Sequence, residues 1–480
     1  MQSAPTLLRT DPTPAHATGG RAAVIITVLA LANLSFAVLQ SLVSPALSTI
    51  GTAFDADTAS TSWIMTSYLL AASVMTPILG KLGDMTGKKK ILVVVLALTL
   101  AGTVISALAP NLGLVIFGRV LQGAAGAVLP LSIALVRDQL APSIMGTVIG
   151  ILSAIAGIGA GIGILVAGPI VENFSWEWLF WLPGAVVLVA LIGTMFGIQE
   201  ASHRASGRLD LLGATVLSIA LITVLLAVSK GSEWGWDSSK TVWLFVSGAV
   251  ALVVFVLIEL KVSEPLIDVR LLSKRGVWTA HVSAAIVGFA MFASFVLIPT
   301  MLQLPEVTGF GFGKTVSEAG LFLLPMIGTL AAFAVIAGIL IRLVGPKVPL
   351  VLGSVILVAS FLYAVGSHET VTQITLAGAL SGAGMGLMLS SAINAVVANV
   401  SAEQTGEATS VNTIARTIGG SIGTAVVGAV IGGQVSAQGL PLEDGFTTSF
   451  WIGAAVAVVG LVAALLVPKL SAAKSGSHHG

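Results

Sequence analysis

The sequence predicts an all-α membrane protein with fourteen transmembrane helices. Of the 480 residues, 56% are hydrophobic and only 9% are charged, whereas soluble domains contain roughly 25% charged residues. A soluble fold of this composition would have too few polar groups to cover its surface, so lipid must surround most of the chain. The apolar residues also fall into long runs, and a helix needs about 20 such residues to cross a bilayer.

Each run is expected to be a helix, because backbone groups in lipid must find their hydrogen bonds within the segment. The short alternating segments of a β-barrel are not seen. The expected spans, in chain order, are residues 22–47, 62–80, 90–109, 112–136, 143–171, 177–198, 210–229, 241–260, 277–303, 318–342, 347–367, 371–399, 406–433 and 446–468.

The distribution of basic residues predicts the orientation of these spans. With the N-terminus in the cytoplasm, only Lys230, Lys240 and Lys314 face outward, Arg119 and Arg416 lie within spans, and the other seventeen Lys and Arg face inward. Cytoplasmic loops carry the excess of Lys and Arg. We therefore expect both termini in the cytoplasm and an even number of spans.

An internal repeat divides the spans into a 6+2+6 arrangement. The segment from Gly80 to Lys89 and the segment from Gly338 to Lys347 share glycine, leucine and charge at matching positions, 258 residues apart. The fourth and twelfth spans match at nearly the same offset, and the fifth and thirteenth are both rich in glycine. The predicted parts are a cytoplasmic tail (1–21), a six-helix half (22–198), two linking helices (199–276), a second six-helix half (277–468) and a second tail (469–480).

Composition also argues against several classes of function. The chain has no cysteine and six histidines, and its 22 basic residues nearly balance its 21 acidic ones. No disulfide, metal site, cofactor site or nucleic-acid partner is expected. No nucleophile–base pair can be assembled, so we expect no catalytic residues and no enzyme activity.

Two motifs resemble those of a known family. The loop after the second span, Gly80-Lys-Leu82-Gly-Asp84-Met-Thr-Gly87-Lys88-Lys89, resembles the loop 2–3 signature of the major facilitator superfamily. The fourth-span segment Arg119-Val-Leu-Gln122-Gly123-Ala-Ala-Gly126 resembles the signature of its drug exporters. With fourteen spans, the chain resembles the drug:proton antiporter branch (EmrB/QacA-like), which implies the major facilitator fold and two pseudo-symmetric six-helix halves.

The loop 2–3 motif is expected to act as a gating latch. The glycines permit a tight turn between closely packed helices, and Asp84 could pair with Arg137 or with a helix N-terminus. The resemblance implies that this contact closes the cytoplasmic side in one state and breaks in the other. The alternative is that the lysines only fix topology. The latch residues are Gly80, Leu82, Asp84, Gly87, Lys88, Lys89 and Arg137.

Arg119 is a charge seven positions into a span, where an ionised group is costly unless it faces protein or a water-filled cavity. It could tune a proton site or hold a substrate carboxylate, or it could cap backbone carbonyls of a neighbouring helix. Gln122 lies one turn further on the same face, and Gly123 and Gly126 complete this proton-coupling or substrate motif.

The fifth span carries glycines, of which Gly159, Gly163 and Gly168 are expected to allow close helix packing. It only partly matches the signature of the antiporter branch. In the first span, Leu39 stands where that branch has an aspartate, and no carboxylate lies deep in any span. The candidates for proton transfer therefore lie near span ends: Asp84, Asp138, Glu172, Glu259, Glu306, Glu318 and His281.

Polar and aromatic residues of the spans indicate a substrate path for a neutral or anionic organic molecule. We expect its lining to include Asn33, Gln40, Tyr68, Phe292, Asn394, Asn412 and Arg416, although such residues can also face lipid or neighbouring helices.

The expected function is export of drugs or secondary metabolites by alternating access in a bacterial plasma membrane. Its partners would be a small organic substrate, the lipid bilayer and, as the resemblance implies, protons; the protein would be a monomer. A lipid or metabolite carrier without proton coupling, or a membrane sensor or scaffold that no longer transports, remains open.

Overall fold

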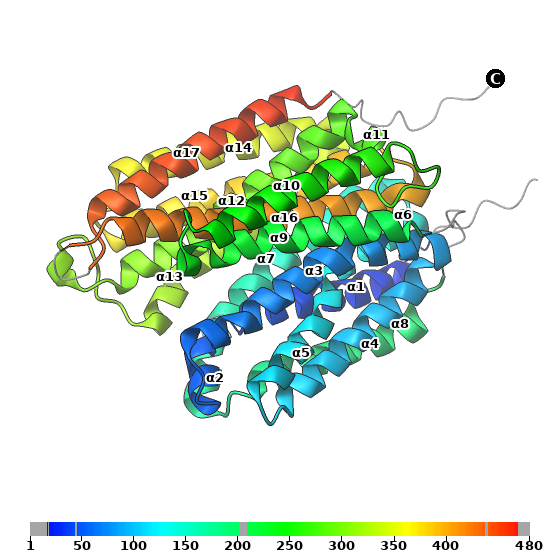
Figure 1. Ribbon diagram of the computed structural model, residues 1–480. Helices are drawn as coiled ribbons and strands as arrows, with labels where there is room; N and C mark the ends of the chain where they lie inside the picture. The colour runs from blue at the N-terminus through cyan, green and yellow to red at the C-terminus, as the bar shows by residue number, and fades with distance from the viewer. Residues whose placement is uncertain (1–16, 18, 44–45, 201–208, 437–439, 469–480) are drawn as a thin grey trace, which may run out of the picture.

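The structure is a computed structural model that describes residues 17, 19–43, 46–200, 209–436 and 440–468. Within these residues the regular elements are helices (Figure 1). Those of the first half are α1 (Gly19–Ser41), α2 (Leu47–Ala53), α3 (Thr58–Thr86), α4 (Lys88–Ala107), α5 (Leu112–Gln122), the 3₁₀ helix η2 (Gly123–Ala127), α6 (Val128–Gln139), α7 (Pro142–Asn173) and α8 (Trp178–Gly197).

The linking region and the second half are also helical. Their helices are α9 (Leu211–Trp234), α10 (Ser239–Glu259), α11 (Val269–Leu272), α12 (Arg275–Gln303), η3 (Glu306–Thr308), α13 (Val316–Val344), α14 (Lys347–Gly366), α15 (Val371–Val397), η4 (Ala402–Gln404), α16 (Thr405–Gly433) and α17 (Glu443–Leu466).

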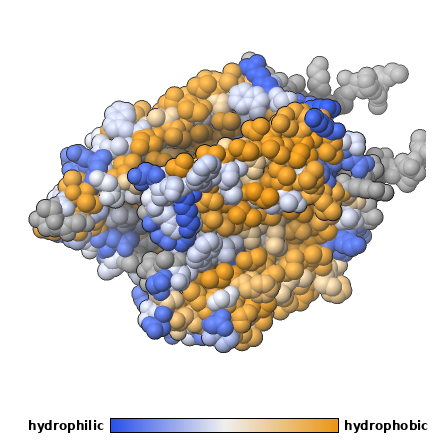
Figure 2. All heavy atoms as spheres, viewed as in Figure 1, coloured by the Kyte–Doolittle hydropathy of each residue, from blue (hydrophilic) through white to orange (hydrophobic). Residues whose placement is uncertain are grey.

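Fourteen helical segments of the described chain are long and apolar enough to cross a membrane. The prediction of fourteen spans is confirmed, with boundaries that shift by a few residues. Figure 2 shows hydrophobic residues over the middle of the visible face and hydrophilic residues toward its two ends, as expected of a protein surrounded by lipid.

Helix ends coincide with local capping signals. Asn111 accepts a hydrogen bond from the N–H of Leu114 at the start of α5, and Asp210 accepts one from Gly213 at the start of α9. Such caps satisfy N–H groups that have no partner within the helix. They lie where one span must stop and the next begin, so the loops can remain short.

The chain forms two six-helix halves with α9 and α10 between them in sequence. In Figure 1, α9 lies between α16 and α3, and it hydrogen-bonds to α3 through Ser229 and Thr66 (3.1 Å) and through Lys230 and Ser62. Ile414 of α16 packs in one cluster with Leu217 of α9. The linking helix therefore contacts both halves.

Helices α7 and α13 form a long seam between the halves. At one end a Cβ added at Gly338 would lie 2.6 Å from the carbonyl oxygen of Gly146, and near the other end one added at Gly320 would lie 3.0 Å from Leu165. Between these points Gly150 packs against Ala334. Glycine thus allows the two backbones to approach closely along most of their length.

The glycines predicted to serve helix packing behave differently from one another. Gly159 packs against Ala37 and Gly163 against Ser41, both on α1. The expectation was wrong for Gly168, because a Cβ added there would meet no heavy atom within 4 Å. Gly168 therefore does not mediate a close helix contact in this structure.

Candidate functional site

The two halves are joined by a hydrogen-bonded latch at the N-terminus of α16. The carboxylate of Asp84, near the end of α3, accepts hydrogen bonds from the backbone N–H of Gly406 (3.3 Å) and Glu407 (3.0 Å). Asp84 is almost fully buried. An anion is stabilised at a helix N-terminus by the free N–H groups and the helix dipole. Of the two partners left open for Asp84, the structure shows the helix N-terminus.

Glu407 extends this latch to the linking region. Its carboxylate pairs with Nζ of Lys81 on α3 (2.9 Å) and accepts a hydrogen bond from the backbone N–H of Asp268 (2.7 Å), between α10 and α11. Glu407 was not predicted as a site residue, because it is only the second residue of its expected span. A carboxylate directly after Thr405-Gly406, at the start of a glycine-rich helix, was the available signal.

Arg137, at the end of α6, binds the loop before α16. It donates to the carbonyl oxygens of Val400 (2.7 Å) and Ser401 (3.0 Å) and to the hydroxyl of Thr405 (2.7 Å). These contacts cross between the halves, as those of Asp84 do. Arg137 therefore belongs to the same latch through neutral acceptors.

Lys88 lies next to the latch residues, and its side chain is fully buried. It pairs with Asp138 (2.5 Å), lies 3.9 Å from Asp84 and donates to the carbonyl oxygen of Ala402 (3.3 Å). We call the end of the molecule at which Asp84, Arg137 and Glu407 lie the latch end. The beginning of α1 and the end of α17 are also at this end (Figure 1).

The glycines of the motif make room for these contacts. A Cβ at Gly80 would lie 3.0 Å from the carbonyl oxygen of Gly406, so the absence of a side chain eases the close approach of α3 to α16. Gly87 adopts φ +128°, and the carboxylate of Glu200 occupies the adjoining space, where it accepts from the N–H of Lys89 (3.1 Å). Leu82 packs against the main hydrophobic core.

The repeated motif in the second half makes only part of the same interface. Gly338 of α13 packs against the beginning of α7, as Gly80 of α3 packs against the beginning of α16. The charged residue at the matching position, Arg342, is however exposed. The acidic cap is therefore present on one side of the pseudo-symmetric interface and replaced by an exposed base on the other.

Arg119 is fully buried within the first half. Its guanidinium donates to the carbonyl oxygens of Leu39 on α1 (3.1 Å) and Ile64 on α3 (3.2 Å) and to the side-chain oxygen of Gln122 (2.7 Å), and it lies 4.1 Å from the ring centroid of Tyr68. Leu39, which replaces the aspartate of the antiporter branch, thus meets the arginine through its backbone.

The fourth span is interrupted immediately after Arg119 and Gln122. Residues Gly123–Ala127 form a 3₁₀ helix that separates α5 from α6, and both Gly123 and Gly126 pack closely on α3, against Ala71 and Ala72. A 3₁₀ stretch inside a helix often marks a hinge. The motif therefore places a tightened segment beside the interface between the halves.

A small central space with a cavity volume of about 10 Å³ lies between the two halves, which is room for about one water molecule in this state. Helices α1, α3, η2 and α16 contribute to it, so both halves take part. The residues that line it are Phe36, Gln40, Tyr68, Leu69, Ala72, Ser73, Thr76, Gly126, Thr413, Ile414 and Thr417.

The residues predicted for the substrate path separate into two groups. Gln40 and Tyr68 line the central space, and Arg416 lies on α16 between Thr413 and Thr417, which also line it. Asn33 instead binds Ser132 (2.9 Å) and Leu29 (2.7 Å) inside the first half.

The other predicted path residues belong to the second half. Asn412 donates toward the carbonyl oxygen of Ala280 (3.4 Å), and Asn394 donates to that of Ser390 (2.9 Å). Phe292 packs beside Gly420 at the contact between α12 and α16. None of these three is among the residues that line the described central space.

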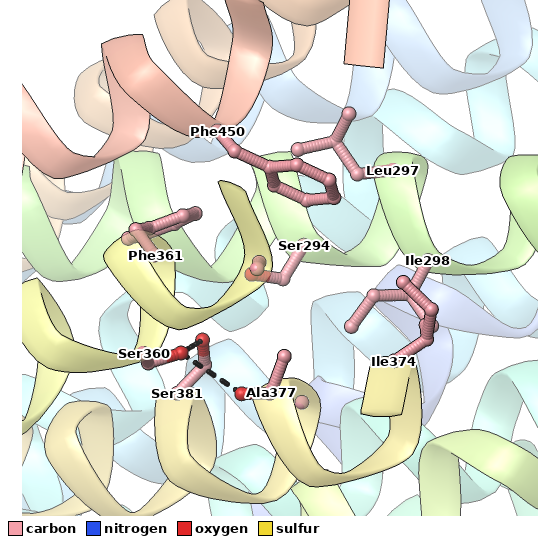
Figure 3. Close-up of a pocket in the computed structure, with 11 residues that line it drawn as sticks. Ser294, Leu297, Ile298, Ser360, Phe361, Ile374, Ala377, Ser381 and Phe450 are labelled. Carbon is pink, nitrogen blue, oxygen red and sulfur yellow. Dashed lines mark hydrogen bonds between the residues drawn. The ribbon is translucent and has the colours of Figure 1, made fainter. Parts of the chain in front are cut away.

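A second space of similar volume lies inside the second half, among α12, α14, α15 and α17 (Figure 3). Its walls are mostly apolar, and Figure 3 shows Phe361, Phe450 and Leu297 grouped on one side. The hydroxyls of Ser360 and Ser381 bond to each other (2.5 Å). Because one half alone forms it, this space does not join the halves as the central space does.

Comparison with known proteins identifies the family. The sequence model of the Major Facilitator Superfamily matches residues 29–424, with a second match over 280–479. The chain belongs to the major facilitator superfamily. It is 27% identical to the multidrug transporter protein MdtP of Bacillus subtilis over 63% of this chain. It is 28% identical to the tetracenomycin C resistance and export protein of Streptomyces glaucescens over 72% of this chain.

These alignments span 55% of the length of MdtP and 64% of that of the tetracenomycin C exporter. The structure also superposes on that of the human organic anion transporter MFSD10, with a TM-score of 0.65 and 14% identity over 93% of this chain and 100% of the other. That likeness concerns the fold. The resemblance to the superfamily is confirmed, and the relatives support its drug-efflux branch.

Proposed function

We propose that this protein is a secondary active transporter that exports small organic molecules, among them drugs, from a bacterial cell. The observation that supports this most is the latch between the halves, which lies at one end of a central space formed by the same halves. Alternating access needs a path that closes at one end through contacts able to break. The relatives named as multidrug and tetracenomycin C exporters support drugs as the substrates.

The orientation follows from the predicted charge distribution. With the latch end in the cytoplasm of a bacterium, the chain would lie in the plasma membrane with both termini inside, acting as a monomer. The structure would then represent a state closed toward the cytoplasm.

We propose that export occurs in exchange for protons and that Asp84 and Glu407 receive them. Protonation of Asp84 would remove the negative charge that faces the N-terminus of α16, and protonation of Glu407 would break its ion pair with Lys81. Both changes weaken the latch. Protons that bind from the outside would therefore favour the state open to the cytoplasm, in which they leave and substrate can enter.

The test uses purified protein in proteoliposomes that contain a pH-sensitive dye. Addition of a substrate should change the lumenal pH in the native protein, and this change should be lost in Asp84→Asn. Glu369→Gln, which removes an exposed carboxylate between α14 and α15 at the opposite end, serves as the matched control. Substrate movement without any pH change would contradict proton exchange and favour an uncoupled carrier of lipids or metabolites. Absence of transport over a broad set of compounds would contradict export.

A further inference from the structure

The two arginines inside the spans differ in what they bind. Arg119 is fully occupied by carbonyl oxygens and Gln122. Arg416 is also buried, with 7% of its surface exposed, yet within the described part of the chain its guanidinium has no hydrogen bond and no ion pair. A buried charge without a partner is costly. The second half thus holds an arginine whose partner is missing.

Arg416 lies beside the central space. Thr413 and Thr417, its neighbours on α16, line this space, and so does Tyr68 of α3. The hydroxyl of Tyr68 is buried and has no hydrogen-bond partner among the described residues. The hydroxyl without a partner comes from one half, and the arginine without a partner comes from the other half, between two threonines that line the same space.

The surroundings provide no negative charge to balance these groups. The described lining of the central space includes no carboxylate. At Leu39, where the antiporter branch has an aspartate, Arg119 meets a backbone carbonyl instead. The centre of the molecule therefore carries positive charge, which would repel a cation and attract an anion.

We propose that the central space binds an organic anion, with the anionic group on Arg416 and Tyr68 and the apolar part against Phe36 and Leu69. This inference rests on the proposed function, because it names the substrate class of the same path. A guanidinium can bind a carboxylate through two parallel hydrogen bonds. Since Tyr68 and Arg416 belong to different halves, a bound anion would connect them.

The experiment measures binding of three coumarins to the full chain in lipid nanodiscs, by fluorescence titration. The probes are 7-methoxycoumarin-3-carboxylate, its uncharged carboxamide and a cationic trimethylammonioethyl amide. The carboxylate should bind at least about tenfold more tightly than the carboxamide, and Arg416→Gln should weaken carboxylate binding by about ten- to a hundredfold, as expected for hydrogen bonds to a charged group. Carboxamide binding should stay unchanged.

Two further variants keep the test decisive if Arg416→Gln does not fold. Arg416→Lys retains the charge and should retain part of the preference for the carboxylate, and Tyr68→Phe should weaken carboxylate binding without reversing the preference. Arg342→Gln, an exposed arginine of the same half, should behave as the native chain. Equal affinity for the three probes, a preference for the cation, or unchanged carboxylate binding in Arg416→Gln would overturn the proposal.

Transport of the same probes into proteoliposomes separates this inference from the proposed function. A carboxylate that binds through Arg416 but does not cross the membrane would support the anion site and contradict export. A carboxamide that crosses, together with a carboxylate that neither binds nor crosses, would support export and contradict the anion site.

Discussion

At the scale of single residues, burial alone does not distinguish a structural arginine from one available to a ligand. Arg119 and Arg416 are both buried, and the difference lies in their acceptors. Arg119 binds carbonyl oxygens on two helices and so connects α1 to α3. This agrees with the capping alternative that the sequence left open beside a role in proton or substrate binding.

Replacement of Arg119 by alanine should destabilise the first half. The change leaves the side-chain oxygen of Gln122 and the carbonyl oxygen of Leu39 without their donor, and each buried unpaired polar atom costs about 1–3 kcal/mol. The apparent melting temperature of the purified protein in detergent should fall clearly. Arg342→Ala, which removes an exposed arginine, should leave it unchanged, and an equal fall in both variants would contradict the structural role of Arg119.

Replacement of Asp84 by asparagine should shift the protein toward a state in which the latch is open. A carboxylate at a helix N-terminus contributes about 0.3–2 kcal/mol, depending on burial. The native chain has no cysteine. The substitutions Thr86→Cys and Ser401→Cys, on opposite sides of the latch, therefore provide the only two sites that a spin label can attach to. The population with the longer label distance should increase.

The control for this measurement is Asp444→Asn, which removes an exposed carboxylate in the first turn of α17. It should leave the distribution of label distances as in the native chain. An unchanged distribution in Asp84→Asn would mean that the carboxylate does not hold the latch closed.

At the scale of helices, the sequence predicted which segments form helices and in which order, but not which face of each helix meets protein. Apolar runs of span length identify helices regardless of which face is turned inward. These helices are apolar nearly all round, so no hydrophobic stripe shows which face meets protein. Position along a span matters as well: Asn33 and Gln40 lie two turns apart on nearly the same face of α1, yet Gln40 lines the central space and Asn33 binds Ser132.

The pairing of the latch residues could not be predicted from the sequence, for a related reason. Asp84 and Glu407 are more than 300 positions apart, and no local pattern shows that α3 ends against the start of α16. The interruption of the fourth span at Gly123–Ala127 was also not predicted, because its residues are as apolar and small as those of a regular helix.

Close packing of α7 on α13 gives a prediction for two glycines of one helix. Gly338→Ala should destabilise the protein by about 1–3 kcal/mol, because the new Cβ would press on the backbone of Gly146. Gly328→Ala is the matched control: nothing lies within 4 Å of its added Cβ, and alanine favours helix over glycine by roughly 1 kcal/mol. Thermal unfolding in detergent should rank Gly328→Ala at or above the native chain and Gly338→Ala below it.

At the scale of the whole molecule, the halves must move relative to each other if the protein transports by alternating access. A Cβ at Gly80 would lie 3.3 Å from Cβ of Ser410, close to the about 3.5–4.5 Å of a disulfide. The double variant Gly80→Cys/Ser410→Cys should form a disulfide on oxidation, keep the latch closed and stop transport in proteoliposomes. A reductant should restore transport.

The single variant Ser410→Cys provides the comparison for oxidation itself and should transport equally before and after it. Continued transport by the fully cross-linked double variant would contradict a mechanism in which α3 and α16 separate. Loss of transport in the reduced double variant would show that the cysteines, and not the cross-link, disturb the helices; the label distances at Thr86 and Ser401 then decide the same question.

The two contact zones between the halves, α7 with α13 and α3 with α16, differ in length, and this affects how the halves can move. Contacts of α7 with α13 extend from Gly146 and Gly338 at the latch end to Leu165 and Gly320 near the other end, whereas hydrogen bonds between α3 and α16 join them at Asp84 and Thr76, toward the latch end. A seam fixed along its length resists separation more than one fixed near a single end. The halves should therefore rotate about an axis close to α7 and α13, so that the opposite edge, where α9 lies, travels farthest.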